Sequence, residues 1–153
     1  SVGINHIDPG NHIPMAPGHL WKSYADWQAA KRLVVTAGTV AVGSSYARGN
    51  ENNLHQPDGV YYLGQGFSPS YGVLSLGGHY QVQRSLQLFV QINNLLNHRY
   101  YTGAQLSTTP FDNNYNFIAR PFPAVNGNFP LRSTTFVAPG APIGAQAGIR
   151  IQF

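Results

Sequence analysis

The sequence predicts an all-β fold whose antiparallel strands form a segment of a transmembrane β-barrel. Apolar and polar residues alternate with period two in several runs, which is typical of strands with one apolar face. Charged residues are only 9% of the chain, against about 25% in soluble domains, so something other than charge must match the exterior to its solvent. Short turns and long loops also alternate along the chain, as they do in bacterial outer-membrane barrels.

The first pair of strands follows an N-terminal loop. Residues Ser1 to Gly18 are interrupted by proline and glycine too often for regular structure. His19 to Gln28 alternates and predicts a strand, and the short connection Ala29 to Arg32 leads to a β-branched run, Leu33 to Tyr46, that predicts another. A helix over Trp21 to Val35 remains an alternative, because this stretch contains several alanines.

The second pair of strands follows a long polar loop, Arg48 to Ser70. Beyond it Leu74, Leu76, Tyr80 and Val82 share one parity, while polar residues take the other. A brief turn, Gln83 to Ser85, then leads to Leu86 to Leu95, whose alternation predicts the best strand of the chain. Phe89 is the exception on its polar side.

The last strand follows the longest segment that we expect to be irregular, Asn97 to Pro142, which is rich in asparagine and proline. Gly144 to Phe153 alternates cleanly and ends on an aromatic residue. Taken alone, this run fits a membrane barrel or an amphipathic strand of a soluble β-sandwich equally well, because barrel signals are weak per segment.

The loop lengths favour the barrel. All the long connections would lie at one end of the sheet, and a structureless loop of about forty residues is unusual in a compact soluble domain. If the C-terminus faces the periplasm, aromatic residues fall near both membrane interfaces. We expect Trp27, Tyr80 and Phe153 near the periplasmic rim, and Tyr46 and Tyr100 near the outer rim.

Composition argues against several other classes of function. The net charge of +4 comes from scattered basic residues, so a nucleic-acid partner is not expected. The chain has no cysteine, and its acidic residues are widely separated, so we expect no enzyme and no cofactor. His6, His12 and His19 share the first loop, but their spacing matches no compact metal motif and we expect no metal site.

A motif before the longest loop resembles that of a known family. Asn93 to Tyr101 reads N-N-L-L-N-H-R-Y-Y and is similar to the N-L-F-D-x-x-Y-Y stretch near the C-terminus of TonB-dependent outer-membrane receptors. Asn94, Leu95, Tyr100 and Tyr101 fit the motif. Leu96 stands where phenylalanine is usual, and Asn97 where aspartate is usual.

Other segments resemble the same family in the expected order. Ile13 to His19 resembles the proline-rich approach to a late descending strand, and Tyr46 to Asn53 resembles the following ascent. The terminal G-I-R-I-Q-F, with Ile149, Ile151 and Phe153, resembles the signal that barrel-assembly machinery reads. The resemblance implies that residues 1–153 are the C-terminal portion of a barrel of about 22 strands, its last five. The plug domain and the earlier strands would then lie outside this chain.

The resemblance also implies a function and partners. Such a receptor lies in the bacterial outer membrane, binds a scarce nutrient such as a ferric siderophore or similar chelate, and imports it with energy delivered by TonB. The implied partners are outer-membrane lipid and lipopolysaccharide, the remaining barrel and plug, the TonB complex, the assembly machinery and a small-molecule ligand. The alternative function is a soluble or surface-exposed β-sheet binding module whose long loops form a recognition face.

The long loops contain the candidate ligand-binding residues. Aromatic side chains occur there in polar surroundings together with arginines, and both suit an anionic, partly aromatic ligand. The candidates are Tyr61, Tyr62, Phe117, Arg120 and Arg132. The alternative is that these aromatic rings pack the loops against one another and against the barrel rim.

Overall fold

The computed structural model describes residues 6–55, 62–111, 114–118 and 133–152. The chain divides into two compact units. The loop unit comprises Ser1–Pro17, Ser44–Pro69 and Tyr101–Ala138, and the sheet unit comprises Gly18–Gly43, Ser70–Tyr100 and Pro139–Phe153. Within the described residues, no helix is long and apolar enough to cross a membrane.

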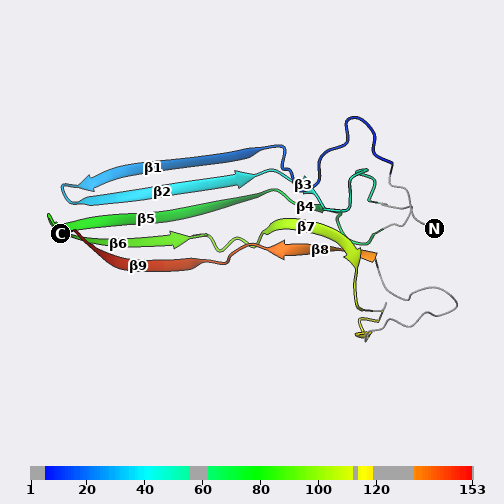
Figure 1. The fold of residues 1–153 in the computed structure, drawn as a ribbon. Helices are drawn as coiled ribbons and strands as arrows, with labels where there is room; N and C mark the ends of the chain where they lie inside the picture. The colour runs from blue at the N-terminus through cyan, green and yellow to red at the C-terminus, as the bar shows by residue number, and fades with distance from the viewer. Residues whose placement is uncertain (1–5, 56–61, 112–113, 119–132, 153) are drawn as a thin grey trace. The chain divides into compact units, whose positions relative to one another are not determined.

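The sheet unit is a five-stranded antiparallel sheet with the order β1-β2-β5-β6-β9. Its strands lie side by side in Figure 1. They are β1 (Leu20–Ala30), β2 (Leu33–Val42), β5 (Tyr71–Gln83), β6 (Leu86–Asn93) and β9 (Gly144–Ile151). All of the predicted strands are therefore present, and the helical alternative for Trp21 to Val35 is wrong.

Short turns join the strands at one end of this sheet. Lys31 and Arg32 connect β1 to β2, and Arg84 and Ser85 connect β5 to β6. Leu86 pairs with Ile151, so β9 also ends here, and we call this the short-turn end. The predicted alternation of short turns with long connections is confirmed for these strands.

Several predicted strand boundaries were wrong. The predicted strand Leu33 to Tyr46 ends at Val42, and Ser45–Tyr46 forms a separate short strand, β3. The break follows Gly43, which donates a backbone hydrogen bond to His19 O at 2.8 Å, as β1 and β2 cease to pair. β1 continues through Ala30, so the turn is shorter than predicted. β6 stops at Asn93, because Asn94 takes a left-handed backbone conformation with φ of 51°.

The described residues of the loop unit form two small sheets. In one, β3 pairs antiparallel with β4 (Phe67–Ser68), and in the other, β7 (Tyr101–Thr108) pairs with β8 (Ser133–Pro139). Ala47, Ala104 and Leu106 form its small buried apolar cluster. The backbone of Arg48 joins this cluster to β7, because its N–H donates to Ala104 O and its carbonyl accepts from Leu106 N.

The prediction that Asn97 to Pro142 is irregular was wrong, because β7 and β8 both lie within it. Their residues do not show a clear apolar parity. In β7, the neighbours Gly103 and Ala104 are both buried, so burial does not follow the alternation that reveals a strand with one apolar face.

Candidate functional site

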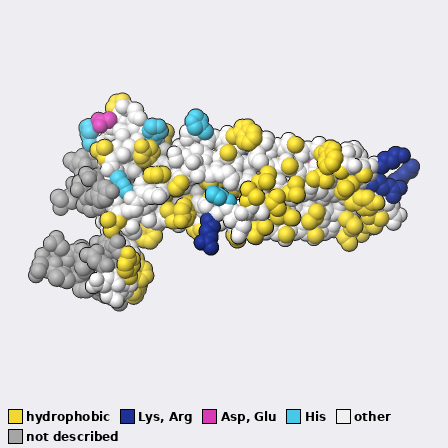
Figure 2. Space-filling model, turned by 180° about the vertical axis from the view of Figure 1, so that it is seen from behind, with side chains coloured by type: hydrophobic (Ala, Val, Ile, Leu, Met, Phe, Trp, Pro, Cys, Tyr) yellow, Lys and Arg dark blue, Asp and Glu magenta, His cyan; other side chains and the backbone are white. Residues whose placement is uncertain are grey.

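One face of the five-stranded sheet is apolar from edge to edge. In register, Leu33, Tyr80, Leu88 and Ile149 form one row, and Val35, Gly78, Val90 and Ala147 form the next row of the same face. Much of this face is exposed, since Val90 is 48% exposed and Ile149 is 64% exposed, whereas Leu33 and Val35 on β2 are half-buried. Hydrophobic side chains spread along the sheet in Figure 2. A continuous exposed apolar face of this kind suits lipid, because large contiguous apolar patches are rare on soluble monomers.

The opposite face is polar and joined by side-chain hydrogen bonds between strands. Gln87 Nε2 donates to Gln81 Oε1 at 3.2 Å, and Arg150 Nη1 donates to Gln87 Oε1 at 3.2 Å. Farther along, Gln146 Nε2 donates to Gln91 Oε1 at 3.1 Å. The sequence predicted this parity, and a polar interior face is what a barrel wall requires.

Two aromatic rings on the polar face cover glycines of neighbouring strands. Tyr24 faces Gly38, where an added Cβ would lie 3.0 Å from ring carbons. Phe89 faces Gly148, where an added Cβ would lie 2.6 Å from Phe89 Cζ. Phe89 departs from the polar pattern of its strand because its ring fills the space above a residue that has no side chain. Such pairs protect glycine backbone and help to fix strand register.

Aromatic residues also lie toward both ends of the sheet. Trp27 and Tyr80 lie on the apolar face near the short-turn end, as predicted. Tyr100 lies beyond β6 and stacks on Tyr71, the first residue of β5, with ring centroids 4.4 Å apart. Trp21, which pairs with Ala41, also lies toward that end and was not predicted as an interface residue. Tyr46 belongs to the loop unit, and Phe153 lies outside the described residues.

The family-like motif forms a tight turn after β6. Asn94 is 2% exposed, and its side chain bonds to three backbone groups. Its Nδ2 donates to His98 O and Ala141 O, each at 2.9 Å, and its Oδ1 accepts from His98 N at 2.9 Å. Leu95 N donates to Leu74 O, and the backbone carbonyl of Tyr101 accepts from Ser68 Oγ. The motif thus ties together segments that are distant in sequence.

The structure describes only some of the candidate ligand residues. Tyr62 packs against the Ala47, Ala104 and Leu106 cluster. Phe117 is well exposed and meets Phe111 edge to face, with ring centroids 5.9 Å apart. Tyr61, Arg120 and Arg132 lie outside the described residues, so the structure does not bring the candidate set together.

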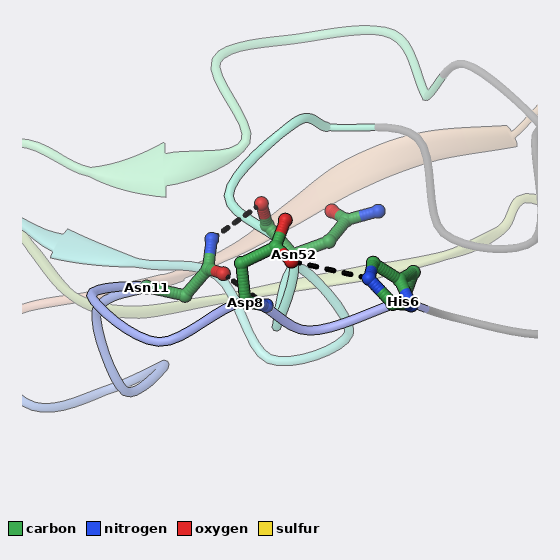
Figure 3. A network of polar contacts seen from close by, with 4 residues as sticks. All are labelled: His6, Asp8, Asn11 and Asn52. Carbon is green, nitrogen blue, oxygen red and sulfur yellow. Dashed lines mark hydrogen bonds and ion pairs between the residues drawn. The ribbon is translucent and has the colours of Figure 1, made fainter.

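The structure describes two residues of the predicted assembly signal and the histidines of the first loop. Ile149 and Ile151 both point from the exposed apolar face of β9. In the first loop, His6 Nε2 lies 3.1 Å from Asp8 Oδ1, and Asn11 Nδ2 donates to Asn52 O at 2.7 Å (Figure 3). The ring of His12 lies against that of Tyr46. Within the described ranges, no group of three histidine, cysteine or acidic residues is placed to hold a metal.

His55 is partly buried in the loop unit. His55 Nε2 lies 3.5 Å from Thr135 Oγ1, and an added Cβ on Gly66 would lie 2.8 Å from its ring. Burial lowers the pKa of His55 from its usual value of 6.5, because a partly desolvated imidazolium is disfavoured. The sequence offered no signal for this contact, which joins residues far apart in the chain.

No family model matches the sequence, and no curated protein matches it. Solved structures do resemble it. The closed form of the ferric-catecholate import receptor Fiu from Escherichia coli K12 has 19% identity and a TM-score of 0.57 over 92% of this chain. The siderophore receptor PiuA from Acinetobacter baumannii has 20% identity and a TM-score of 0.54 over 90% of this chain.

The chain covers only 15% of the Fiu chain and 14% of the PiuA chain. At this level of identity the likeness concerns the fold. It agrees with the sheet topology, because these receptors are built around antiparallel β-barrels and the described strands form an open antiparallel sheet with one exposed apolar face. The chain therefore has the fold of a segment of the β-barrel of TonB-dependent siderophore receptors, as the motif around Asn94 predicted.

Proposed function

We propose that this chain forms part of the barrel wall of a TonB-dependent receptor in the bacterial outer membrane. The receptor binds a scarce nutrient, such as a ferric siderophore or similar chelate, and imports it with energy delivered by TonB. The observation that carries the proposal is the pairing of an exposed apolar face with a hydrogen-bonded polar face on one antiparallel sheet. That combination fits a wall with lipid on one side and a polar lumen on the other.

The proposal assigns transport and not catalysis to the protein. The remaining barrel, the plug, the TonB complex, lipopolysaccharide and the assembly machinery are its proposed partners. The polar face presents glutamine, histidine and arginine side chains, which suit a water-filled or plugged interior. We further propose that the loops contact the ligand through Tyr61, Tyr62, Phe117, Arg120 and Arg132, because aromatic rings and guanidinium groups suit an anionic aromatic chelate.

Cell fractionation tests the proposed membrane location, and uptake measurements test the proposed transport function. We expect the protein in outer-membrane fractions, with a gel mobility that changes when the sample is boiled. Cells lacking it should take up less of one ferric chelate under iron limitation, and disruption of TonB should cause the same loss. A soluble, detergent-free monomer would instead indicate a β-sheet binding module.

Loop variants test the ligand site separately. Combined Tyr62→Ala and Phe117→Ala should weaken ligand binding by tenfold or more if each ring contributes about 1 kcal/mol. The matched control is Ser85→Ala, which lies in a short turn of the sheet unit. Unchanged ligand affinity in the loop variant, at normal outer-membrane levels, would remove these two residues from the site.

A further inference from the structure

Basic residues gather at the short-turn end of the sheet. Lys31 and Arg32 form the β1–β2 turn, Arg84 lies in the β5–β6 turn, and all three are exposed. Arg32 Nη1 donates to Val82 O at 3.1 Å, which holds this guanidinium beside the end of β5, close to the turn that contains Arg84. Figure 2 shows one group of lysine and arginine side chains at one end of the view and another group away from it. We call Lys31, Arg32 and Arg84 the basic rim.

The sheet unit offers the basic rim little negative charge. In its sequence ranges, 18–43, 70–100 and 139–153, Asp26 is the only aspartate or glutamate. Asp26 Oδ1 accepts a hydrogen bond from Thr36 Oγ1 at 2.6 Å, and the two residues are paired across β1 and β2. Among the residues that the structure describes, no ion pair joins Asp26 to the basic rim, so these cations are available to an anion from outside the sheet.

The basic rim borders the apolar face. Trp27, which is 68% exposed, and Tyr80 lie on that face close to the short turns. Toward the short-turn end this face still carries aliphatic side chains, because Leu86 and Ile151 lie beyond the row of Tyr80, and the cations of the short turns follow. Acyl chains and then phosphates follow one another in the same order across one leaflet of a membrane.

We propose that the basic rim binds the phosphate groups of anionic phospholipids in the leaflet at the short-turn end. The proposal rests on the membrane location proposed above. A phospholipid matches both parts of the surface, since its acyl chains cover the row of Leu33, Tyr80 and Leu88 while its phosphate meets the cations. A soluble anion would leave the apolar rows uncovered, and the arginine forks suit phosphate oxygens.

Native mass spectrometry of the purified, detergent-solubilised protein that contains this chain tests the proposal. The protein is mixed with equal amounts of phosphatidylglycerol and phosphatidylcholine, and the lipids retained are counted. The test variant combines Lys31→Gln, Arg32→Gln and Arg84→Gln. The control combines Lys22→Gln, Arg48→Gln and Arg99→Gln, which remove the same charge from positions outside the basic rim.

We expect the unaltered protein and the control to retain phosphatidylglycerol in preference to phosphatidylcholine. The basic-rim variant should lose this preference by about fivefold for each cation removed. Equal preference in all three proteins, or equal loss in both variants, would overturn the proposal. Fractionation of the same variants separates the two hypotheses: normal outer-membrane location without lipid preference refutes only the basic rim, whereas a soluble protein refutes the membrane location as well.

Discussion

At the scale of single residues, close contacts on the polar face explain why glycine occurs at two positions within the strands. Glycine in a strand usually weakens it, because it has no side chain to pack and loses more backbone entropy. Here Gly38 and Gly148 each lie beneath a ring from the neighbouring strand. The ring supplies the packing that the glycine lacks, so these positions stabilise the pairing of β1 with β2 and of β6 with β9.

Replacing Gly148 by alanine should destabilise the folded sheet by about 1–3 kcal/mol, because the new methyl group would overlap the Phe89 ring. The temperature at which the folded gel band disappears measures this loss. Gly144→Ala is the matched control in the same strand and on the same face, because nothing lies within 4 Å of its Cβ position.

The Phe89→Ala background completes this test. With the ring removed, the added cost of Gly148→Ala should largely disappear, since the two changes act on one contact. A cost that is the same with and without the ring would show that the contact does not control the strand pairing.

Acid should loosen the segment around His55. Its folded-state pKa lies below the usual 6.5, so near and just below that pH the unfolded segment binds more protons than the folded one. The contribution to stability is complete above pH 6.5 and declines as the pH falls toward the folded-state pKa. Amide exchange at His55 and Tyr62, corrected for intrinsic rates, should therefore accelerate over this range.

His55→Gln provides the comparison for that measurement, because glutamine does not titrate. Its exchange should follow only the intrinsic pH dependence. An identical acid response in both proteins would assign the loosening to another group.

At the scale of elements, the two faces of β6 should respond oppositely to the same substitution. Val90 lies on the exposed apolar face, and Gln91 lies on the polar face. Val90→Arg should cost about 2–4 kcal/mol near the middle of a bilayer, whereas Gln91→Arg should be tolerated. The folded fraction in outer membranes measures both, and equal sensitivity at the two neighbours would contradict a lipid-facing role for this strand.

The strands that the sequence predicted are those that separate apolar from polar residues by parity. Leu86 to Asn93 shows this separation, and its predicted face agrees with the register. β7 and β8 were missed because their burial comes from contacts within the loop unit, such as that of Leu106 with Ala47. Only the family motif indicated the turn at Asn94. The Asn94 side chain bonds to the backbone of His98 and of Ala141, and neither contact follows from the alternation of apolar and polar residues.

The sequence could not decide the roles of the candidate ligand residues in the loops. An aromatic residue in a polar loop can either pack or bind, and composition does not separate the two roles. Tyr62 packs on the small apolar cluster, whereas Phe117 is exposed beside Phe111. Their roles in ligand binding stay predictions that the loop variants test.

At the scale of the whole molecule, the strand order leaves β1 and β9 at opposite edges of the described sheet. Each of these strands has one neighbour in that order, so one edge of its backbone needs further partners if the sheet lies in a bilayer. An unsatisfied N–H or C=O group costs several kcal/mol in hydrocarbon, and each edge presents several such groups. For this segment alone, the exposed apolar face therefore favours insertion into lipid, whereas the edges of the described sheet oppose it.

We therefore expect residues 1–153 alone not to insert into bilayers as a folded monomer, whereas a protein in which further strands pair with β1 and β9 should insert. Refolding both into phosphatidylcholine vesicles, followed by proteolysis and unboiled electrophoresis, measures insertion. The segment alone should remain protease-sensitive or associate through its edges, because strand pairing between copies satisfies the same backbone groups. Cross-linking between cysteines introduced at Ala25 and Ala147, which both lie on the apolar face, would detect β1–β9 pairing between copies. A protease-resistant, monomeric 153-residue chain in the bilayer would show that these edges are satisfied within the chain itself.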